Sequence, residues 1–191
     1  MIIVLNGYPG VGKLTIGRAL AGLLGGKLLD IHTVYNVAFA LTEFKTPEFR
    51  EAVERVEEIA HDLVLKLPAG TPVVFTTVLA GDSDWGTAEW KRLEDLGGER
   101  PPFCVIHVSC DLEENIRRIE DPGRDGMRKP RDPDMARRNQ EQAKPLAGSG
   151  ARHLLKLDTT GLSAELSAQR IADWIKKIQG PDAGAPPEPT N

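Results

Sequence analysis

The sequence predicts a three-layer α/β fold in which helices cover both faces of a five-stranded parallel sheet. Five short apolar runs alternate along the chain with segments whose apolar residues recur every three or four positions. The runs are largely continuous rather than alternately polar, which is typical of parallel strands buried on both faces. Strands and helices that alternate in this way are joined by right-handed crossovers, and these place helices on both sides of the sheet.

The predicted strands cover residues 2–5, 27–30, 72–79, 103–109 and 153–157. Helical spacing predicts helices over residues 13–24, 32–42, 47–67, 87–96 and 163–178, with a turn over 97–102. Thr46 and Pro47 mark a helix start, because Thr is a good N-cap and Pro suits the first helical position. Asp111 followed by Glu114 has the spacing of a capping box, which predicts another helix start.

Length and composition restrict the classes of protein to which this chain can belong. At 191 residues it is expected to form one domain over residues 1–179, followed by a disordered Pro- and Gly-rich tail over 180–191. A net charge of −4 makes nucleic acid an unlikely partner. Two cysteines cannot form a disulfide framework, and no segment is long and apolar enough for a signal peptide or membrane span. We therefore expect a cytoplasmic protein without membrane contact.

A glycine-rich loop between the first strand and the first helix is the strongest motif. Its residues are Gly7, Tyr8, Pro9, Gly10, Val11, Gly12 and Lys13. Glycines with this spacing let successive backbone N–H groups point into one concavity, and the helix N-terminus adds partial positive charge. The Lys13 ammonium would then contact the β- and γ-phosphates of a nucleotide.

The residue after the motif lysine departs from the simple pattern, since Leu14 stands where Ser or Thr is usual and Thr15 comes one position later. This G-x-P-G-x-G-K-x-T form resembles the nucleoside monophosphate kinases. Most of residues 1–178 resembles the wider superfamily of P-loop small-molecule kinases, which includes adenylate, shikimate and gluconate kinases and chloramphenicol phosphotransferase. The resemblance is strongest to bacterial proteins known only as ATP-binding or kinase-like.

This resemblance implies a P-loop NTPase fold with strand order 2-3-1-4-5, and ATP and Mg²⁺ as nucleotide and metal. Leu14 cannot ligate a cation. Thr15 is the candidate metal-site residue, and it could instead contact a phosphate or a magnesium-bound water.

Candidate acceptor residues follow the second and third strands, where ligands bind in sheets of this type. Asp30 ends the second strand, and the resemblance implies a base that orients or deprotonates an acceptor hydroxyl; an N-cap for the next helix is the alternative. His32 could bind an acceptor or simply begin that helix. Thr77 could hold a magnesium-bound water, since the third strand contains no acid, and Asp82 or Asp84 could act from the loop. Trp85 could wall the acceptor pocket or pack in the core.

An arginine-rich segment over about 119–138 is predicted to form a lid. Residues 117–138 contain eight basic and five acidic side chains. Guanidinium groups suit phosphate because they are planar and bidentate, and they stabilise the charge of a transferring phosphoryl group. The resemblance implies that Arg118 opens the lid and stacks on adenine, and that Arg124 and Arg128 contact phosphates. A solvated charged loop is the alternative.

The loop after the last strand contains Asp158, Thr159 and Thr160. The resemblance implies that this loop flanks the adenine, while an ordinary strand-to-helix turn is the alternative. Together these features predict an ATP-dependent phosphotransferase that acts on a small-molecule hydroxyl or phosphate. A nucleotide-dependent regulatory ATPase without such an acceptor is the alternative. The sequence leaves the acceptor and the oligomeric state open.

Overall fold

A computed structural model describes residues 1–81, 83–121 and 132–180 of the chain. Its five strands are β1 (Ile2–Asn6), β2 (Lys27–Asp30), β3 (Val73–Thr77), β4 (Phe103–Ser109) and β5 (His153–Asp158). They pair in parallel in the order β2-β3-β1-β4-β5. The predicted fold class and strand order are therefore confirmed.

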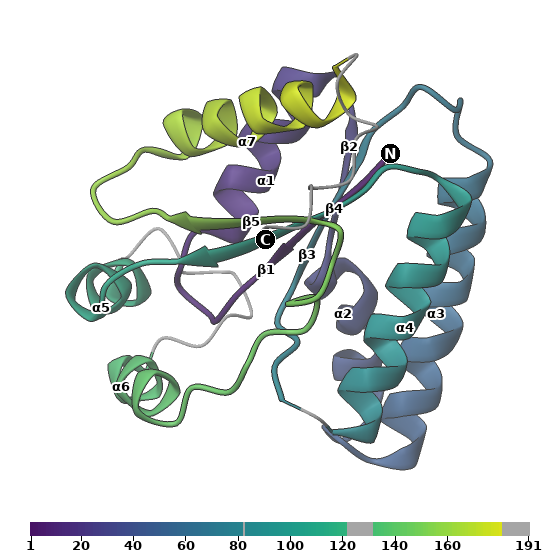
Figure 1. The fold of residues 1–191 in the computed structure, drawn as a ribbon. Coiled ribbons are helices and arrows are strands. Elements are labelled where there is room, and N and C mark those ends of the chain that lie inside the picture. Colours follow the sequence, from purple (N-terminus) through teal and green to yellow (C-terminus); the bar gives the residue numbers. More distant parts are fainter. Residues whose placement is uncertain (82, 122–131, 181–191) are drawn as a thin grey trace, which may run out of the picture.

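Helices cover both faces of this sheet (Figure 1). On one face lie α1 (Lys13–Leu24) and α7 (Ala164–Gln179), and on the other lie α2 (Ile31–Leu41), α3 (Pro47–Leu65) and α4 (Asp84–Glu99). Two shorter helices, α5 (Leu112–Glu120) and α6 (Pro133–Glu141), lie beyond the carboxyl ends of β4 and β5. The carboxyl edge of the sheet is thus bordered by helices from both halves of the chain.

The core divides into clusters because successive residues of β1 face opposite sides of the sheet. Ile3 and Leu5 pack in a cluster with residues of α1 and α7, while Ile2 and Val4 pack in a cluster with residues of α3 and α4. All five residues of β1 are fully buried, as the continuous apolar run predicted for its first four. A third, smaller cluster joins α2 to α3 and contains Val34, Ala38, Phe49 and Val53.

The predicted boundaries of one helix and one strand are wrong. The helix predicted over 87–96 begins earlier, because the Ser83 side chain accepts a hydrogen bond from the Gly86 amide at 3.1 Å. It also continues through Gly97 and Gly98 to Glu99, where a turn was predicted. Gly97 packs against Phe103, and a Cβ at that position would lie 2.2 Å from the ring. The glycine therefore serves close helix–strand packing rather than a turn. The third strand is shorter than predicted and ends at Thr77.

Among the described residues, no helix is long and apolar enough to cross a membrane. Arg124, Arg128, Asp82 and the predicted tail after Gly180 lie outside the described part of the chain. The middle of the predicted lid, residues 122–131, lies outside it as well.

Candidate nucleotide and acceptor site

The phosphate loop connects β1 to α1 and has the curled backbone that its glycines predicted. Gly10 and Gly12 have φ values of 92° and 96°, a region that residues with a Cβ rarely adopt. Gly7 is required for a different reason, since a Cβ there would lie 2.3 Å from the Val108 carbonyl oxygen. The loop therefore lies directly against β4 at the carboxyl edge of the sheet.

Lys13 is the first residue of α1 and is nearly buried. Its Nζ donates to the carbonyl oxygens of Gly7 at 2.6 Å and Tyr8 at 2.9 Å. The loop thus curves around its own lysine, and the ammonium lies next to the amide end of the helix. Both the ammonium and the helix N-terminus favour an anion at this place.

Helix α5 and the loop after β5 hold the phosphate loop from the outside. Asn115 Nδ2 donates to the Pro9 carbonyl at 3.2 Å, and Arg118 Nη1 donates to the Val11 carbonyl at 3.1 Å. The same guanidinium donates to the Thr159 hydroxyl at 2.9 Å and to its carbonyl at 2.8 Å. Arg118 therefore joins three segments that are far apart in the sequence.

Glu114 completes this arrangement by accepting hydrogen bonds from Arg117 and, at 2.6 Å, from Arg118 Nε. These arginines, Arg117 first, lower the pKa of Glu114 to about 2. The capping-box prediction is half confirmed, since Asp111 Oδ1 accepts from the Glu114 amide at 2.7 Å. The reciprocal bond is absent: the Asp111 amide donates to Thr160 Oγ1 instead. The Glu114 carboxylate orients arginines rather than capping α5.

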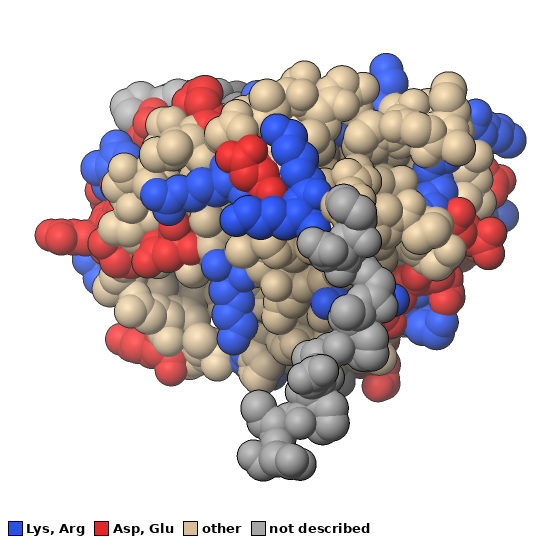
Figure 2. Space-filling view, turned by 45° about the horizontal axis from the view of Figure 1, so that its top comes forward, with Lys and Arg blue, Asp and Glu red and all other residues tan. Residues whose placement is uncertain are grey.

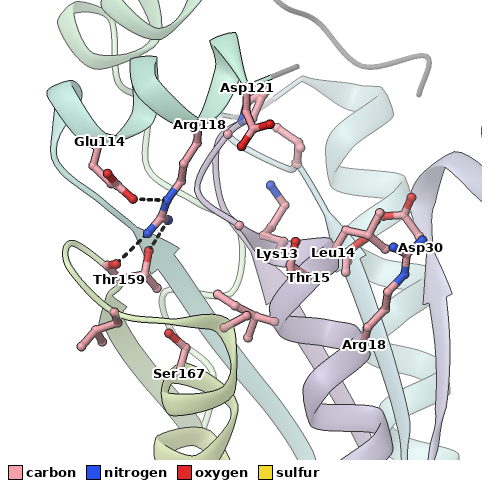
Figure 3. Close-up of a pocket in the computed structure, with 18 of the residues that line it drawn as sticks. Lys13, Leu14, Thr15, Arg18, Asp30, Glu114, Arg118, Asp121, Thr159 and Ser167 are labelled. Atoms are coloured by element: carbon pink, nitrogen blue, oxygen red, sulfur yellow. Dashed lines mark hydrogen bonds and ion pairs between the residues drawn. The ribbon is translucent and has the colours of Figure 1, made fainter. Parts of the chain in front are cut away.

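A cavity of about 440 Å³ opens over the phosphate loop. Figure 3 shows Glu114, Arg118 and Thr159 on one side, Arg18 and Asp30 on the other, and Lys13 and Thr15 between them. The cavity is lined by Pro9, Gly10, Gly12, Lys13, Leu14, Thr15, Ile16, Arg18, Asp30, Ile31, His32, Thr76, Val78, Glu114, Arg117, Arg118, Asp121, Thr159, Leu162, Ala164 and Ser167. Both predicted ends of the site, nucleotide and acceptor, therefore belong to one cavity.

At the acceptor end, Asp30 is the N-cap residue of α2 but its side chain makes no capping hydrogen bond. Instead it accepts a hydrogen bond from the Thr76 hydroxyl, because β2 and β3 pair with Asp30 opposite Thr76. The alternative prediction of a helix-capping side chain is thus wrong. His32 also lines the cavity from the first turn of α2.

Other predicted residues lie away from the cavity lining. Thr77 is buried in β3, and Trp85 packs between the guanidinium groups of Arg50 and Arg92 at 5.7 and 5.8 Å. Asp158 Oδ1 accepts from the Thr160 amide at 2.8 Å, which forms the turn predicted as the alternative for this loop. Gly7, Tyr8 and Val11 shape the phosphate loop without lining the cavity, whereas Thr159 does line it.

Several lining residues were not predicted. Leu162 comes from the loop before α7, Ala164 and Ser167 come from the first turn of α7, and Val78 follows β3. In sequence they belong to ordinary loop and helix patterns, so no signal distinguishes them. The position of Arg18 could have been noticed in the sequence, because a basic residue lies there on the exposed side of α1, five residues after Lys13. Whether it reaches the cavity depends on how α1 packs beside β2, which the sequence does not show.

Charges of both signs are interspersed on the face of the molecule drawn in Figure 2. Among the described residues, ion pairs join Arg137 to Asp134 at 2.9 Å and Arg138 to Asp132 at 2.8 Å. Groups of three or more metal-ligating side chains are absent from the described residues.

A family model described as an AAA domain matches residues 3–144, which is more than half of the chain. The chain belongs to this AAA domain family. This AAA-domain chain is 32% identical over 120 residues to a shikimate kinase from Salinispora tropica, covering 62% of this chain and 65% of that protein. It is 37% identical over 84 residues to a shikimate kinase from Corynebacterium efficiens, covering 40% of this chain and 50% of that protein.

The matched part of the AAA-domain chain thus spans less than two thirds of either curated relative. A solved structure with a similar fold is a sugar kinase from a Janibacter species, with a TM-score of 0.61 and 18% identity over 92% of this chain and 94% of that one. The predicted membership of the P-loop kinase superfamily is confirmed by these matches.

Proposed function

We propose that the protein transfers the γ-phosphoryl group of ATP to a hydroxyl or phosphate group of a small molecule. The observation that carries this proposal is the shared cavity: Lys13 at the phosphate loop and the Asp30 carboxylate both line it. A site that only bound a nucleotide would not need an acid and a histidine lining its far end. The shikimate kinase relatives support the same class of reaction.

The nucleotide end fits a triphosphate. Lys13 and the loop amides would hold the β- and γ-phosphates, and the cavity wall formed by Thr159, Leu162 and Ser167 would lie against the base. Arg118 offers a flat guanidinium that its bonds to Val11 and Thr159 keep in place. The predicted phosphate contacts of Arg124 and Arg128 remain part of this proposal.

The donor set also fits Mg²⁺. Magnesium bound to a nucleotide takes most ligands from phosphates and water, with one or two protein oxygens. The Thr15 hydroxyl lines the cavity beside Lys13 and is the protein ligand that we propose. When bound, the ion would neutralise charge on the β- and γ-phosphate oxygens.

At the acceptor end, Asp30 would accept or orient the proton of the attacking hydroxyl while Thr76 fixes the carboxylate in place. Arg18 is exposed at the same end of the cavity, which favours an acceptor that also carries an anionic group. The cavity walls exclude water around both reacting groups, so that transfer is favoured over hydrolysis.

Two measurements test the proposal. Thermal-shift screening of hydroxylated metabolites with a non-hydrolysable ATP analogue would identify the acceptor, because a bound ligand raises the melting temperature. ADP formation from ATP and Mg²⁺ should then rise on adding that acceptor and be lost in Lys13→Ala. Lys27→Ala is the matched control, since Lys27 is exposed on β2 outside the cavity. Equal ADP formation with and without acceptor would instead favour a regulatory ATPase.

A further inference from the structure

A cluster of buried and partly buried ionisable and aromatic side chains lies between α4 and the pair formed by α2 and α3. It consists of Tyr35 from α2, Glu54, Glu57 and His61 from α3, and Trp85, Glu89 and Arg92 from α4. None of these seven side chains lines the cavity. Because burying ionisable groups is costly, the cluster requires an explanation outside the proposed chemistry.

Glu89 lies at the centre of the cluster and is 1% exposed. Its Oε2 accepts a hydrogen bond from the Tyr35 hydroxyl at 2.7 Å, and its Oε1 has no hydrogen-bond partner in the described part of the chain. Burial, and next the charge of Glu57, raise the pKa of Glu89 to about 7. The hydrogen bonds from Tyr35 and Trp85 and the charge of Arg92 lower the pKa of Glu89, but these effects are smaller than the rise. Glu89 therefore changes charge close to neutral pH.

Arg92 is the cation of the cluster, but its guanidinium pairs with Glu57 and Glu54 rather than with Glu89. Its Nε and Nη2 lie 2.8 and 2.7 Å from Glu57 Oε2, and its Nη1 lies 3.7 Å from Glu54. Glu57 is itself 6% exposed. Burial, and next the charge of Arg92, lower the pKa of His61, which disfavours a positive charge on this imidazole. An ionised Glu89 is therefore incompletely compensated.

The apolar residues of α2 and of the first half of α3 form a different cluster from those of α4, although Val64 near the end of α3 packs with α4 and Trp85 of α4 packs against the first cluster. Val34 and Ala38 of α2 pack with Phe49 and Val53 of α3, whereas Trp90, Leu93 and Leu96 of α4 belong to the cluster on the sheet. Figure 1 shows α3 and α4 side by side with α2 next to them. The contacts that Tyr35 of α2 and Glu57 of α3 make with α4, through Glu89 and Arg92, are polar. Such a joint can open locally at lower cost than an apolar core.

Helix α2 also carries the acceptor end of the cavity. It begins immediately after Asp30, and its first two residues, Ile31 and His32, line the cavity. Tyr35 lies one helical turn after Ile31. The hydrogen bond from Tyr35 to Glu89 therefore holds the helix that positions Asp30 and His32.

We propose that Glu89 is a pH-dependent latch: in its protonated form it holds α2 and α3 against α4, and on ionisation it releases them. The effect of the latch on catalysis rests on the proposed function, in which Asp30 and His32, positioned by α2, contact the acceptor. The latch itself does not depend on that function, because it concerns only the attachment of α2 and α3 to α4.

The direction follows from linkage. In an opened joint the Glu89 carboxyl meets water and ionises near its ordinary pKa of 4.5, whereas in the closed joint it keeps its proton up to about 7. The closed form is thus favoured at low pH, and this advantage is lost as pH rises. Opening should increase by about tenfold for each pH unit between roughly 5 and 7 and level off above that.

Hydrogen–deuterium exchange of the full chain tests the latch without any ligand. The protection of residues 31–41 is measured from pH 5 to 8, corrected for the intrinsic exchange rate at each pH, with residues 164–179 as internal reference. In the wild type, protection of 31–41 should fall by roughly tenfold per pH unit up to about 7, while the reference changes little. In Glu89→Gln the protection of 31–41 should be independent of pH.

Three further variants keep the proposal falsifiable if Glu89→Gln folds poorly. Tyr35→Phe removes a hydrogen bond that favours the charged form, so the pH midpoint should rise. Glu57→Gln removes a neighbouring negative charge, so the midpoint should fall. Glu99→Gln, exposed on the same helix, is the matched control and should leave the midpoint unchanged.

Two results would overturn the latch. One is a wild-type α2 whose corrected protection does not change between pH 5 and 8. The other is the same pH dependence in Glu89→Gln as in the wild type. Either result leaves the proposed kinase activity untouched, because that activity is tested by ADP formation.

Discussion

Arg118 of α5 donates to the carbonyl oxygen of Val11 at 3.1 Å, and this bond ties the phosphate loop to a helix more than one hundred residues away. The same guanidinium holds Thr159 after β5 and Glu114 one turn earlier. The shape of the loop is therefore maintained from outside as well as by its own glycines. We expect Arg118 to increase nucleotide affinity by holding the loop in shape, in addition to any direct contact that it makes with the nucleotide.

Replacing Arg118 with Ala should weaken ATP binding by roughly thirtyfold, because charge-assisted hydrogen bonds to buried groups contribute about 2 kcal/mol. Isothermal titration calorimetry with ATP and Mg²⁺ measures this directly. Arg137→Ala is the control, since Arg137 is exposed on α6 and pairs only with Asp134 among the described residues. Equal affinities in the two variants would contradict a role for Arg118 in holding the loop.

Asp30→Asn should lower kcat by about 10²- to 10⁴-fold, the usual contribution of a general base. ATP affinity should change little, because Asp30 lies at the acceptor end of the cavity. Thr76→Val should have a smaller effect, since it removes only the hydroxyl that fixes the carboxylate. Steady-state kinetics with the acceptor found by screening measures kcat for both variants. A loss of ATP binding in Asp30→Asn would place this acid at the nucleotide end instead.

The adjacent glycines of α4 should respond in opposite ways to alanine. Gly97→Ala would place a Cβ 2.2 Å from the Phe103 ring, so the variant should lose about 1–3 kcal/mol of unfolding free energy. Nothing lies within 4 Å of a Cβ on Gly98, so Gly98→Ala should gain up to about 1 kcal/mol by favouring the helix. Urea denaturation of both variants measures the difference. Destabilisation by both to the same extent would mean that this end of α4 is not packed as described.

Both cysteines should react slowly with thiol reagents in the folded protein. Burial raises the pKa of the Cys104 thiol to about 12 and also raises the pKa of Cys110. At pH 8 both thiols therefore remain protonated and weakly nucleophilic. A colorimetric thiol reagent should modify two groups rapidly in denaturant and neither rapidly without it. Fast reaction of the folded protein at Cys110 would show that burial does not protect this thiol.

Local sequence patterns were sufficient for the strands and the phosphate loop. The apolar run of β1 and the glycine spacing of residues 7–13 depend on interactions close in sequence. Both were therefore predicted correctly, the loop between a strand and a helix. The same holds for the N-caps Thr46 and Ser163, which each accept a hydrogen bond from an amide three residues later. Helix ends were less predictable, because Gly97 lies within α4 and packs closely against Phe103, a contact that local residue patterns do not reveal.

The sequence by itself determined the strand and helix content and the glycine-rich loop at the start of α1, because these follow from spacing along the chain. Only the tertiary structure decided that Arg118 supports the loop, that Asp30 faces Thr76, and that Glu89 is buried beside Glu57. Each of these contacts joins segments at least thirty residues apart, and packing rather than local pattern brings them together. The burial of a side chain and the charges around it at such contacts cannot be deduced from the residues next to it in sequence.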